Sequence, residues 1–477
     1  MASATVTTHG KVDLGVLKGP PYWTILTLAA PTVFAMLFQS AVNEIDVVFF
    51  SHLPYPESSN AQAALLPSLI LVWLFGGSLS AISVGTQALV GRRYAEHDHE
   101  AAGRVLANSA FFCLIAGLVF SVIGAFTIRK LISLMIPGNP EAQNIAYEYS
   151  RYRLLGVISM SMTMAVKAFF DGISKTYVHF VASLLMNVVN VVLCYTFIFG
   201  HFGAPRMGAP GAGLSALIAT WIGLAIMLVY AARERKRFQP LKWSNLSRSL
   251  TWDVLKLSIP AGFATIVMMV GFGLFSSVAG RLDKEALHGA AATAMSEAVN
   301  GAATTNIVAL MKLTFTACIA FGTATATLVA QSLGAKLPEE AQKFGWASVR
   351  LGLVVFGVIG LCEGVLFTPQ IVGVISHSEA VRDAMMGPMR LMGMLTPIIA
   401  VAMILTEALF GAGTPTFVAG AQFVLVFFVL VPLAYVLALL MNQGLMGMWM
   451  GAAVYICTAA VVMTTKFRLG AWKKIQL

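Results

Sequence analysis

The sequence predicts an all-α integral membrane protein with twelve transmembrane helices in two pseudo-symmetric six-helix lobes. Three observations predict this fold: the composition, a regular series of long apolar segments, and a long internal repeat. Of the 477 residues, 58% are hydrophobic and only 11% are charged, and the mean hydropathy is +0.80. Because a soluble domain typically carries about 25% charged residues, this composition places the chain in a membrane.

Twelve apolar segments are each long enough to cross a bilayer as a helix, which needs about 20 residues. Strands of a membrane barrel would be about 10 residues long and would alternate in polarity. Residues 1–20 are polar and lack the apolar core of a cleavable signal peptide, so the first segment is expected to act as its own insertion signal. The segments lie near 23–50, 62–90, 105–128, 146–170, 177–200, 211–232, 255–280, 301–332, 347–373, 386–411, 417–441 and 445–466.

The charge distribution predicts the orientation of the chain in the cytoplasmic (inner or plasma) membrane. The net charge is +10. Most lysines and arginines fall in segments that face inside if both termini are cytoplasmic, and the basic stretch RERKRFQPLKWSNLSR is the largest cluster. This is the positive-inside pattern, so we interpret the charge as topology rather than as a nucleic-acid surface. The five cysteines are scattered in apolar segments and show neither a disulfide framework nor a zinc motif.

The internal repeat predicts the domain organisation. Residues 88–109 align with residues 327–348, and the same register aligns Gly172 with Gly411. Six spans separate equivalent positions, so the two halves should be related by an axis along the membrane normal, as in several transporter folds. We expect an N-lobe at 1–232 with a tail at 1–21, a basic cytoplasmic linker at 233–254, and a C-lobe at 255–477.

The first span carries two carboxylates, although a charge in the bilayer centre costs roughly 2.5–3.5 kcal/mol. Asp46 shares a helix face with Gln39 and Asn43, whereas Glu44 lies on a different face with Ser40. The stripe of Gln39, Asn43 and Asp46 is therefore the better candidate to line a cavity. The alternative is that either carboxylate reaches water at the outer interface.

Span five offers a matching polar stripe of Asn187, Asn190 and Cys194. If the two stripes meet, Asp46 lies in a hydrogen-bonding pocket where its charge can be switched by a proton. Glu44, Cys194 and Lys312 are further candidates for a substrate cavity. Lys312 lies deep in span eight, where it lines the cavity, pairs with Glu297 or Glu363, or reaches the outer interface.

Other intramembrane residues favour structural interpretations. Lys167 and Asp171 are four residues apart, which favours an ion pair near the inner interface, and Glu407 is expected to reach the same interface. Pro31 and Pro260 each interrupt a span and predict kinks. Pro31 is a candidate element that bends when Asp46 changes charge, and a static kink is the alternative.

The chain resembles the multidrug and toxic compound extrusion (MATE) transporters over about 450 residues. Six motifs occur in the order typical of that family. They are Pro31, Gln39 and Asp46 in the first span, and then GTQALVGRRYAEHDHEAAGR, GISKTYVHF, SLLMNVVNVVLCYTFIFG, MGAPGAGLSA and ATLVAQSLGAKLPEEA.

This resemblance implies two six-helix lobes in a V, alternating access, and export of cationic or amphipathic organic compounds in exchange for inward protons or sodium ions. It also implies a lipid-embedded monomer with no cofactor beyond the coupling ion. Cys194 stands where family members often have Asp, and Ala216 where they often have Thr. Sodium is a hard cation that prefers several oxygen ligands, and a sodium site would rest on Asp46 and Asn190 alone. We therefore favour protons as the coupling ion.

Two other functions compete with an antiporter. A flippase for lipid-linked precursors would belong to the same superfamily, but its cavity should hold several basic residues for pyrophosphate. A membrane-embedded prenyl transferase needs clustered carboxylates for magnesium–diphosphate binding. The sequence has no DDxxD-like cluster and no HExxH, GxSxG or Walker-type motif, so we do not expect an enzyme.

Overall fold

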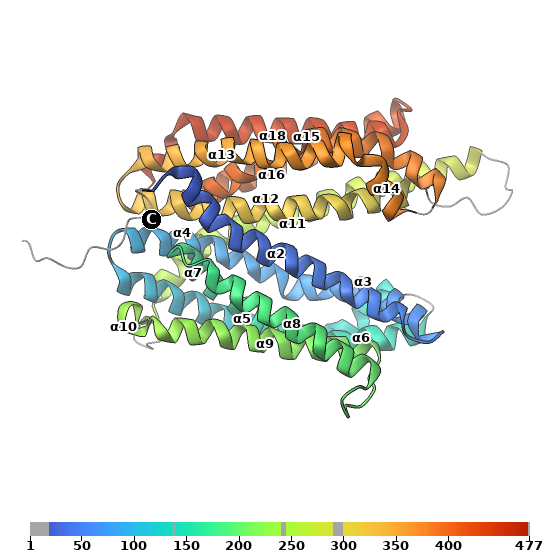
Figure 1. Cartoon of the computed structure of the whole chain (residues 1–477), viewed down its shortest axis with the longest axis horizontal. Helices are drawn as coiled ribbons and strands as arrows, with labels where there is room; N and C mark the ends of the chain where they lie inside the picture. Colours follow the sequence, from blue (N-terminus) through green and yellow to red (C-terminus); the bar gives the residue numbers. More distant parts are fainter. Residues whose placement is uncertain (1–18, 137–138, 240–244, 290–298, 377, 476–477) are drawn as a thin grey trace, which may run out of the picture.

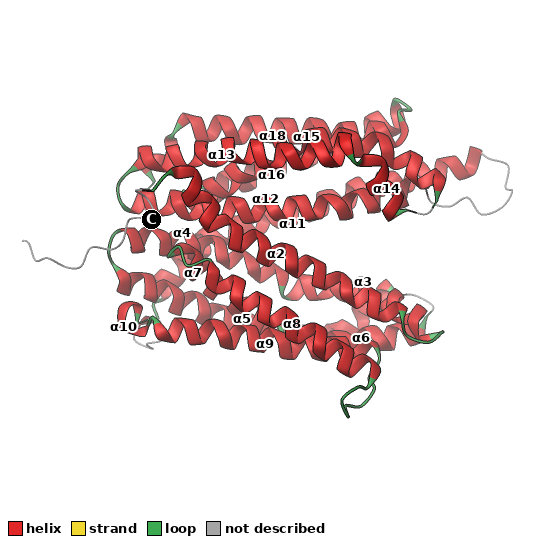
Figure 2. Cartoon of the chain, viewed as in Figure 1, coloured by secondary structure: helices red, strands yellow, loops and turns green. Residues whose placement is uncertain are grey.

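The computed structural model describes residues 19–136, 139–239, 245–289, 299–376 and 378–475, and within them every regular element is a helix (Figure 2). Eleven helices are long and apolar enough to cross a membrane, and a bent pair brings the number to twelve. The predicted helical membrane fold is thus confirmed for the described residues.

The first group of helices runs from the first span to the predicted linker. Long apolar stretches form most of these helices, and polar residues cap the starts of α5 and α6. Asp98 accepts a hydrogen bond from the Ala101 amide at the start of α5, and Asn139 does the same for Ala142 in α6. The elements are α2 (Pro21–Ser51), α3 (Glu57–Phe75), η1 (Gly77–Ala81), α4 (Ile82–Ala95), α5 (His99–Met135), α6 (Pro140–Leu155), α7 (Val157–Gly172), α8 (Tyr177–Phe199), α9 (Ala209–Arg233) and the short α10 (Arg235–Phe238).

The second group has a similar arrangement and contains three π-helical turns among its described residues. Its elements are α11 (Arg248–Gly289), α12 (Val299–Gly334), α13 (Pro338–Leu361), η3 (Cys362–Leu366), α14 (Thr368–Ile375), α15 (Glu379–Gly411), α16 (Pro415–Leu425), η4 (Val426–Leu430), α17 (Val431–Tyr435), η5 (Val436–Leu440), α18 (Gly444–Leu469) and η6 (Ala471–Lys474).

The two groups form two bundles that meet at one end (Figure 1). We call it the linker end, because it carries α10 and the start of α11, which belong to the predicted linker. It also carries the turns that follow α4, α7, α12 and α15, and the end of α18 (Figure 1). Helix α4 contacts α12 and α15 there, and α7 contacts α12. Toward the opposite end, the far end, the two groups of ribbons diverge in Figure 1. We predict from the charge distribution that the linker end is cytoplasmic.

Two helices pass from one bundle to the other. The first turns of α2 contribute Ile25 and Leu28 to the core formed by α12, α13, α15 and α18, whereas Phe50 packs in the core of the first bundle. In the same way α11 contributes Val254 to the core of the first bundle and Phe275 to that of the second. Figure 1 shows α2 running obliquely between the bundles. The lobe boundaries by residue number remain a prediction.

The predicted fourth span is not one straight helix. Helices α6 and α7 meet at Gly156 with a bend of 43°. The Gly156 amide donates to the Arg153 carbonyl, three residues back rather than four, and the Ser159 hydroxyl donates to the Gly156 carbonyl. These local bonds satisfy the backbone at the break. In contrast, α2 and α11 continue through Pro31 and Pro260.

Candidate functional site

Asp46 faces helix α8 from the last third of α2. Its side chain is half-buried. The thiol of Cys194 lies 3.7 Å from Asp46 Oδ1 and 3.4 Å from Asn190 Oδ1, so its single S–H is within reach of either oxygen. One thiol therefore connects the predicted stripes on spans one and five, and Asp46, Asn190 and Cys194 form one cluster.

Helix α6 adds Tyr149 and Arg153 to this cluster, and the motif comparison did not single out either residue. The Tyr149 ring is buried and packs edge-on against Phe50, with 6.5 Å between ring centroids. The Arg153 guanidinium lies 5.9 Å from the centre of the Tyr149 ring. Both residues interact with the Asp46 carboxylate. The sequence signal was their spacing of four, which puts them on one helix face directly before the apolar part of span four.

The Tyr149 hydroxyl is a buried group without a regular hydrogen bond to any described atom. It nevertheless lies close enough to Asp46 to act on the carboxylate. The carbonyl oxygen of Asn187 is a second such group within the described residues, while the Asn187 amide nitrogen donates to Ser183 Oγ at 3.4 Å. Buried polar atoms in native proteins are usually paired, so the Asn187 oxygen is placed to accept a hydrogen bond from a water molecule or a ligand, whereas the Tyr149 hydroxyl is within reach of the Asp46 carboxylate.

The remaining predicted residues are less closely connected to Asp46. Gln39 is half-buried on α2 and has an interaction of its own. The side chains of Asn43 and Glu44 lie outside the described residues. Lys312 is exposed on α12, has an interaction of its own, and does not belong to the described groups that act on Asp46. Its suggested partner Glu363 accepts a hydrogen bond from Thr314 at 3.0 Å.

The donor atoms around Asp46 are few. The cluster offers the Asp46 carboxylate, the Asn190 amide oxygen and the Tyr149 hydroxyl, with a thiol between the first two. The Ser215 hydroxyl of α9 acts on the same thiol and donates its own proton to the Gly211 carbonyl at 2.7 Å. Ala216 is buried on α9 and has no side-chain oxygen. The described residues contain no group of three or more His, Cys, Asp or Glu arranged to hold a metal ion.

The two bundles are joined at the linker end by buried polar contacts. Gln87 on α4 donates to the Thr323 carbonyl at 2.9 Å and to Thr327 Oγ1 at 2.8 Å on α12. Gln331 of α12 makes a similar contact in the opposite direction, donating to the Gly172 carbonyl of α7 at 2.7 Å. Asp46 lies 25 residues beyond the start of α2, or about 37 Å along the helix at 1.5 Å per residue. The site is therefore remote from the closed end.

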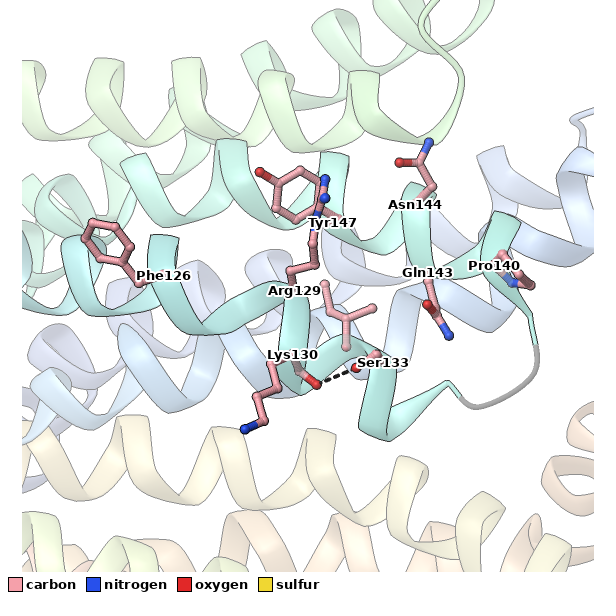
Figure 3. Close-up of a pocket in the computed structure, with 9 residues that line it drawn as sticks. Phe126, Arg129, Lys130, Ser133, Pro140, Gln143, Asn144 and Tyr147 are labelled. Carbon is pink, nitrogen blue, oxygen red and sulfur yellow. Dashed lines mark hydrogen bonds between the residues drawn. The ribbon is translucent and has the colours of Figure 1, made fainter.

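A pocket in Figure 3 lies between the far end of α5 and the start of α6. Arg129 lies over the Tyr147 ring at 4.5 Å, and the Ser133 hydroxyl donates to the Lys130 carbonyl at 2.8 Å. Its lining contains two cations and no carboxylate. Because a coupling cation needs an anionic group, this pocket is not the ion site.

Two helical bundles that close at one end and hold a half-buried carboxylate near the other define a polytopic membrane transporter. The MatE family model matches residues 31–196 and 260–436. This is more than half of the chain, so the chain belongs to the MatE family of membrane transporters, and the resemblance seen in the sequence is confirmed.

Curated relatives match over nearly the whole chain. The probable multidrug resistance protein NorM of Thermotoga maritima is 22% identical over 459 residues, which cover 94% of this chain and 93% of the relative. The probable multidrug resistance protein YoeA of Bacillus subtilis is 22% identical over 472 residues, which cover 96% of each chain.

Solved structures share the fold. A MOP superfamily transporter from Pyrococcus furiosus, described as having a binding pocket of reverse polarity, has a TM-score of 0.85 at 21% identity and covers 98% of this chain and 100% of its own. A multidrug resistance MATE family transporter in an outward-facing conformation has a TM-score of 0.84 at 21% identity, with the same coverage.

Proposed function

We propose that this protein is a secondary active antiporter that exports small organic compounds, cationic or amphipathic, in exchange for inward protons by alternating access. The observation that carries the proposal is the half-buried Asp46 carboxylate, which shares the Cys194 thiol with Asn190 and interacts with Tyr149 and Arg153. Intramembrane ionisable residues commonly mark ion pathways. The names of the relatives, multidrug resistance proteins, support small organic substrates.

The chemistry of the cluster favours a proton over sodium. A hard cation prefers several oxygen ligands, and thiols suit soft metals. Here the thiol of Cys194 lies between the two strongest oxygen ligands, and Arg153 brings a positive charge. A proton needs only the carboxylate. Its binding would remove a charge from half-buried surroundings and so change the relative stability of the two transporter shapes.

Reconstitution in vesicles tests this function. Uptake of a lipophilic cationic dye is measured with a pH gradient or a sodium gradient imposed separately, for the wild type and Asp46→Asn. Asp253→Asn is the matched control, because 48% of the Asp253 side chain is exposed and its described ion pair is with Lys256 at 3.3 Å. We expect uptake with the pH gradient, its loss in Asp46→Asn, and wild-type uptake in Asp253→Asn.

Each other outcome changes the proposal in a defined way. Uptake that continues with neither gradient contradicts antiport. Uptake with sodium alone contradicts proton coupling. Normal uptake against a gradient by Asp46→Asn removes Asp46 from the mechanism.

A second candidate, a flippase for lipid-linked precursors, gains some support from Arg153, which adds a half-buried cation to the site. A pyrophosphate group pairs well with guanidinium groups. Translocation of a fluorescent polyprenyl diphosphate by the wild type, and not by Arg153→Gln, would favour this function. Dye uptake without lipid translocation would exclude it.

A further inference from the structure

A second group of ionisable residues lies where the bundles meet. The Lys167 amine on α7 contacts Asp171 Oδ2 at 2.6 Å, with 12% of the lysine side chain and none of the aspartate side chain exposed. Glu407, from α15 of the other bundle, is half-buried and packs over Gly322 of α12. The Lys167–Asp171 pair adjoins the same helix, because Thr327 Oγ1 of α12 donates to the Asp171 carbonyl at 3.0 Å. Lys167 therefore lies within electrostatic range of Glu407 across the boundary between the bundles. The expected location of Glu407 at the membrane interface is thus corrected: it faces the other bundle.

The charges in this group do not balance. One ammonium faces two carboxylates, which leaves one net negative charge when both acids are ionised. Asp171 Oδ1 has no hydrogen-bond partner among the described atoms. His179 on α8 also interacts with Lys167, and its Nδ1 is buried without a described partner. A second cation beside Lys167 would be repelled, so we count His179 as neutral.

The other charged groups around these helices are already engaged. Buried ions are unfavourable unless they are paired, and the described cations near these helices have other partners. Arg92 donates to the carbonyls of Ala412 and Ile475, Lys175 pairs with Glu234, and Lys466 lies over the Phe417 ring.

We propose that Lys167, Asp171 and Glu407 form a second proton-binding site, which holds the two bundles together at the linker end when it carries one proton. In the closed arrangement a single proton brings the net charge of the buried group to zero. When the bundles separate, Glu407 leaves Lys167 and water reaches the carboxylates. Both acids then ionise, and the proton leaves toward the side that we predict to be cytoplasmic.

The inference rests on the alternating access of the proposed function, but it is tested without transport. Spin labels at His97→Cys and Lys336→Cys, both exposed in turns at the linker end, report the distance between the bundles by pulsed electron resonance across a pH series. The exposed Cys457 is replaced by Ser. All variants carry Asp46→Asn, so Asp46 contributes no proton to the pH response. The distance measurement does not depend on transport, so it can be interpreted even if the antiporter assignment is wrong.

We expect the short-distance population to grow as the pH falls, by up to about tenfold in the closed-to-open ratio per pH unit for one proton. Glu407→Gln should be closed and insensitive to pH, because its neutral amide leaves Lys167 balanced by Asp171 alone. Lys167→Gln should close only at lower pH and with a steeper response, because two carboxylates must then be neutralised.

Glu363→Gln is the matched control, because Glu363 is another half-buried acid of the second bundle and hydrogen-bonds Thr314. It should keep the pH response of the parent. If Glu407→Gln does not fold, Asp171→Asn takes its place with the same expected result. A parent-like pH response in the folded variant, or a distance that follows sodium concentration rather than pH, would overturn the proposal.

Discussion

Asp46 is a charged residue whose neighbours, more than its own chemistry, determine what it can do. Cys194 and Tyr149 are weak or neutral partners, whereas Arg153 is a full positive charge. A nearby cation favours the ionised carboxylate. Arg153 is therefore expected to control the pH at which Asp46 exchanges its proton.

We predict that Arg153→Gln moves the pH–rate profile of transport by about one unit toward alkaline pH, because the carboxylate loses the cation that stabilises its charge. The profile is measured in vesicles with a fixed substrate. Arg153→Lys should retain most of the wild-type profile. Arg151→Gln is the control, since Arg151 pairs with Glu148 at 2.9 Å on the exposed face of the same helix. A profile unchanged by Arg153→Gln would contradict the role.

At the scale of elements, close helix packing at the linker end depends on glycine. A Cβ atom at Gly334 of α12 would lie 2.4 Å from the Arg92 carbonyl oxygen of α4. Real Cβ contacts are much longer, so α4 and α12 approach this closely only because residue 334 has no side chain. The two helices belong to different bundles, and their separation opens the linker end.

We predict that Gly334→Ala shifts the protein toward separation at the linker end, by about 1–3 kcal/mol, the typical range for overpacking. The same spin-label pair measures the shift as a larger long-distance population. Gly357→Ala is the control, because a Cβ there meets nothing within 4 Å. Alanine is a better helix former than glycine, so the substitution should not destabilise α12 itself. Unaltered distances in Gly334→Ala would mean that α4 and α12 adjust without separating.

At the scale of the whole molecule, polar contacts and small residues hold the bundles together at the linker end, which suits the separation that the proposed function requires. Most large apolar side chains pack within one bundle, and α2 and α11 are the exceptions. Separation therefore exposes amide and carbonyl groups that water can satisfy. This difference between bundle cores and the surface between them makes rigid-body movement feasible.

We predict that a disulfide between Gly91→Cys and Ala330→Cys stops transport and that reduction restores it. A Cβ atom at Gly91 would lie 2.9 Å from the Ala330 Cβ. Disulfides need about 3.5–4.5 Å, so a small shift of α4 from α12 suffices. Each single cysteine variant is the control and should transport with or without oxidant. Full transport by the oxidised, cross-linked protein would contradict alternating access through this end.

The membrane fold could be predicted from the sequence because each span carries its own signal. Twenty apolar residues are needed to cross a bilayer wherever they lie in the chain, so the count of eleven or twelve helices follows from local composition. The bend at Gly156 could not be predicted in this way. Gly156 is one of 42 glycines in the sequence, and no pattern around it sets it apart. The hydrogen bonds that stabilise the bend form only in the folded chain.

The sequence by itself determined the helices, the orientation predicted from the charge pattern, and the polar stripes of Asp46 and Asn190, because composition and helical periodicity are properties of the chain. Only the tertiary structure decided that Cys194 connects these stripes, and that Arg153 and Lys167 lie within electrostatic range of Asp46 and Glu407. Those contacts join residues far apart in the chain. They exist because packing brings specific helix faces together, and no local pattern encodes that choice.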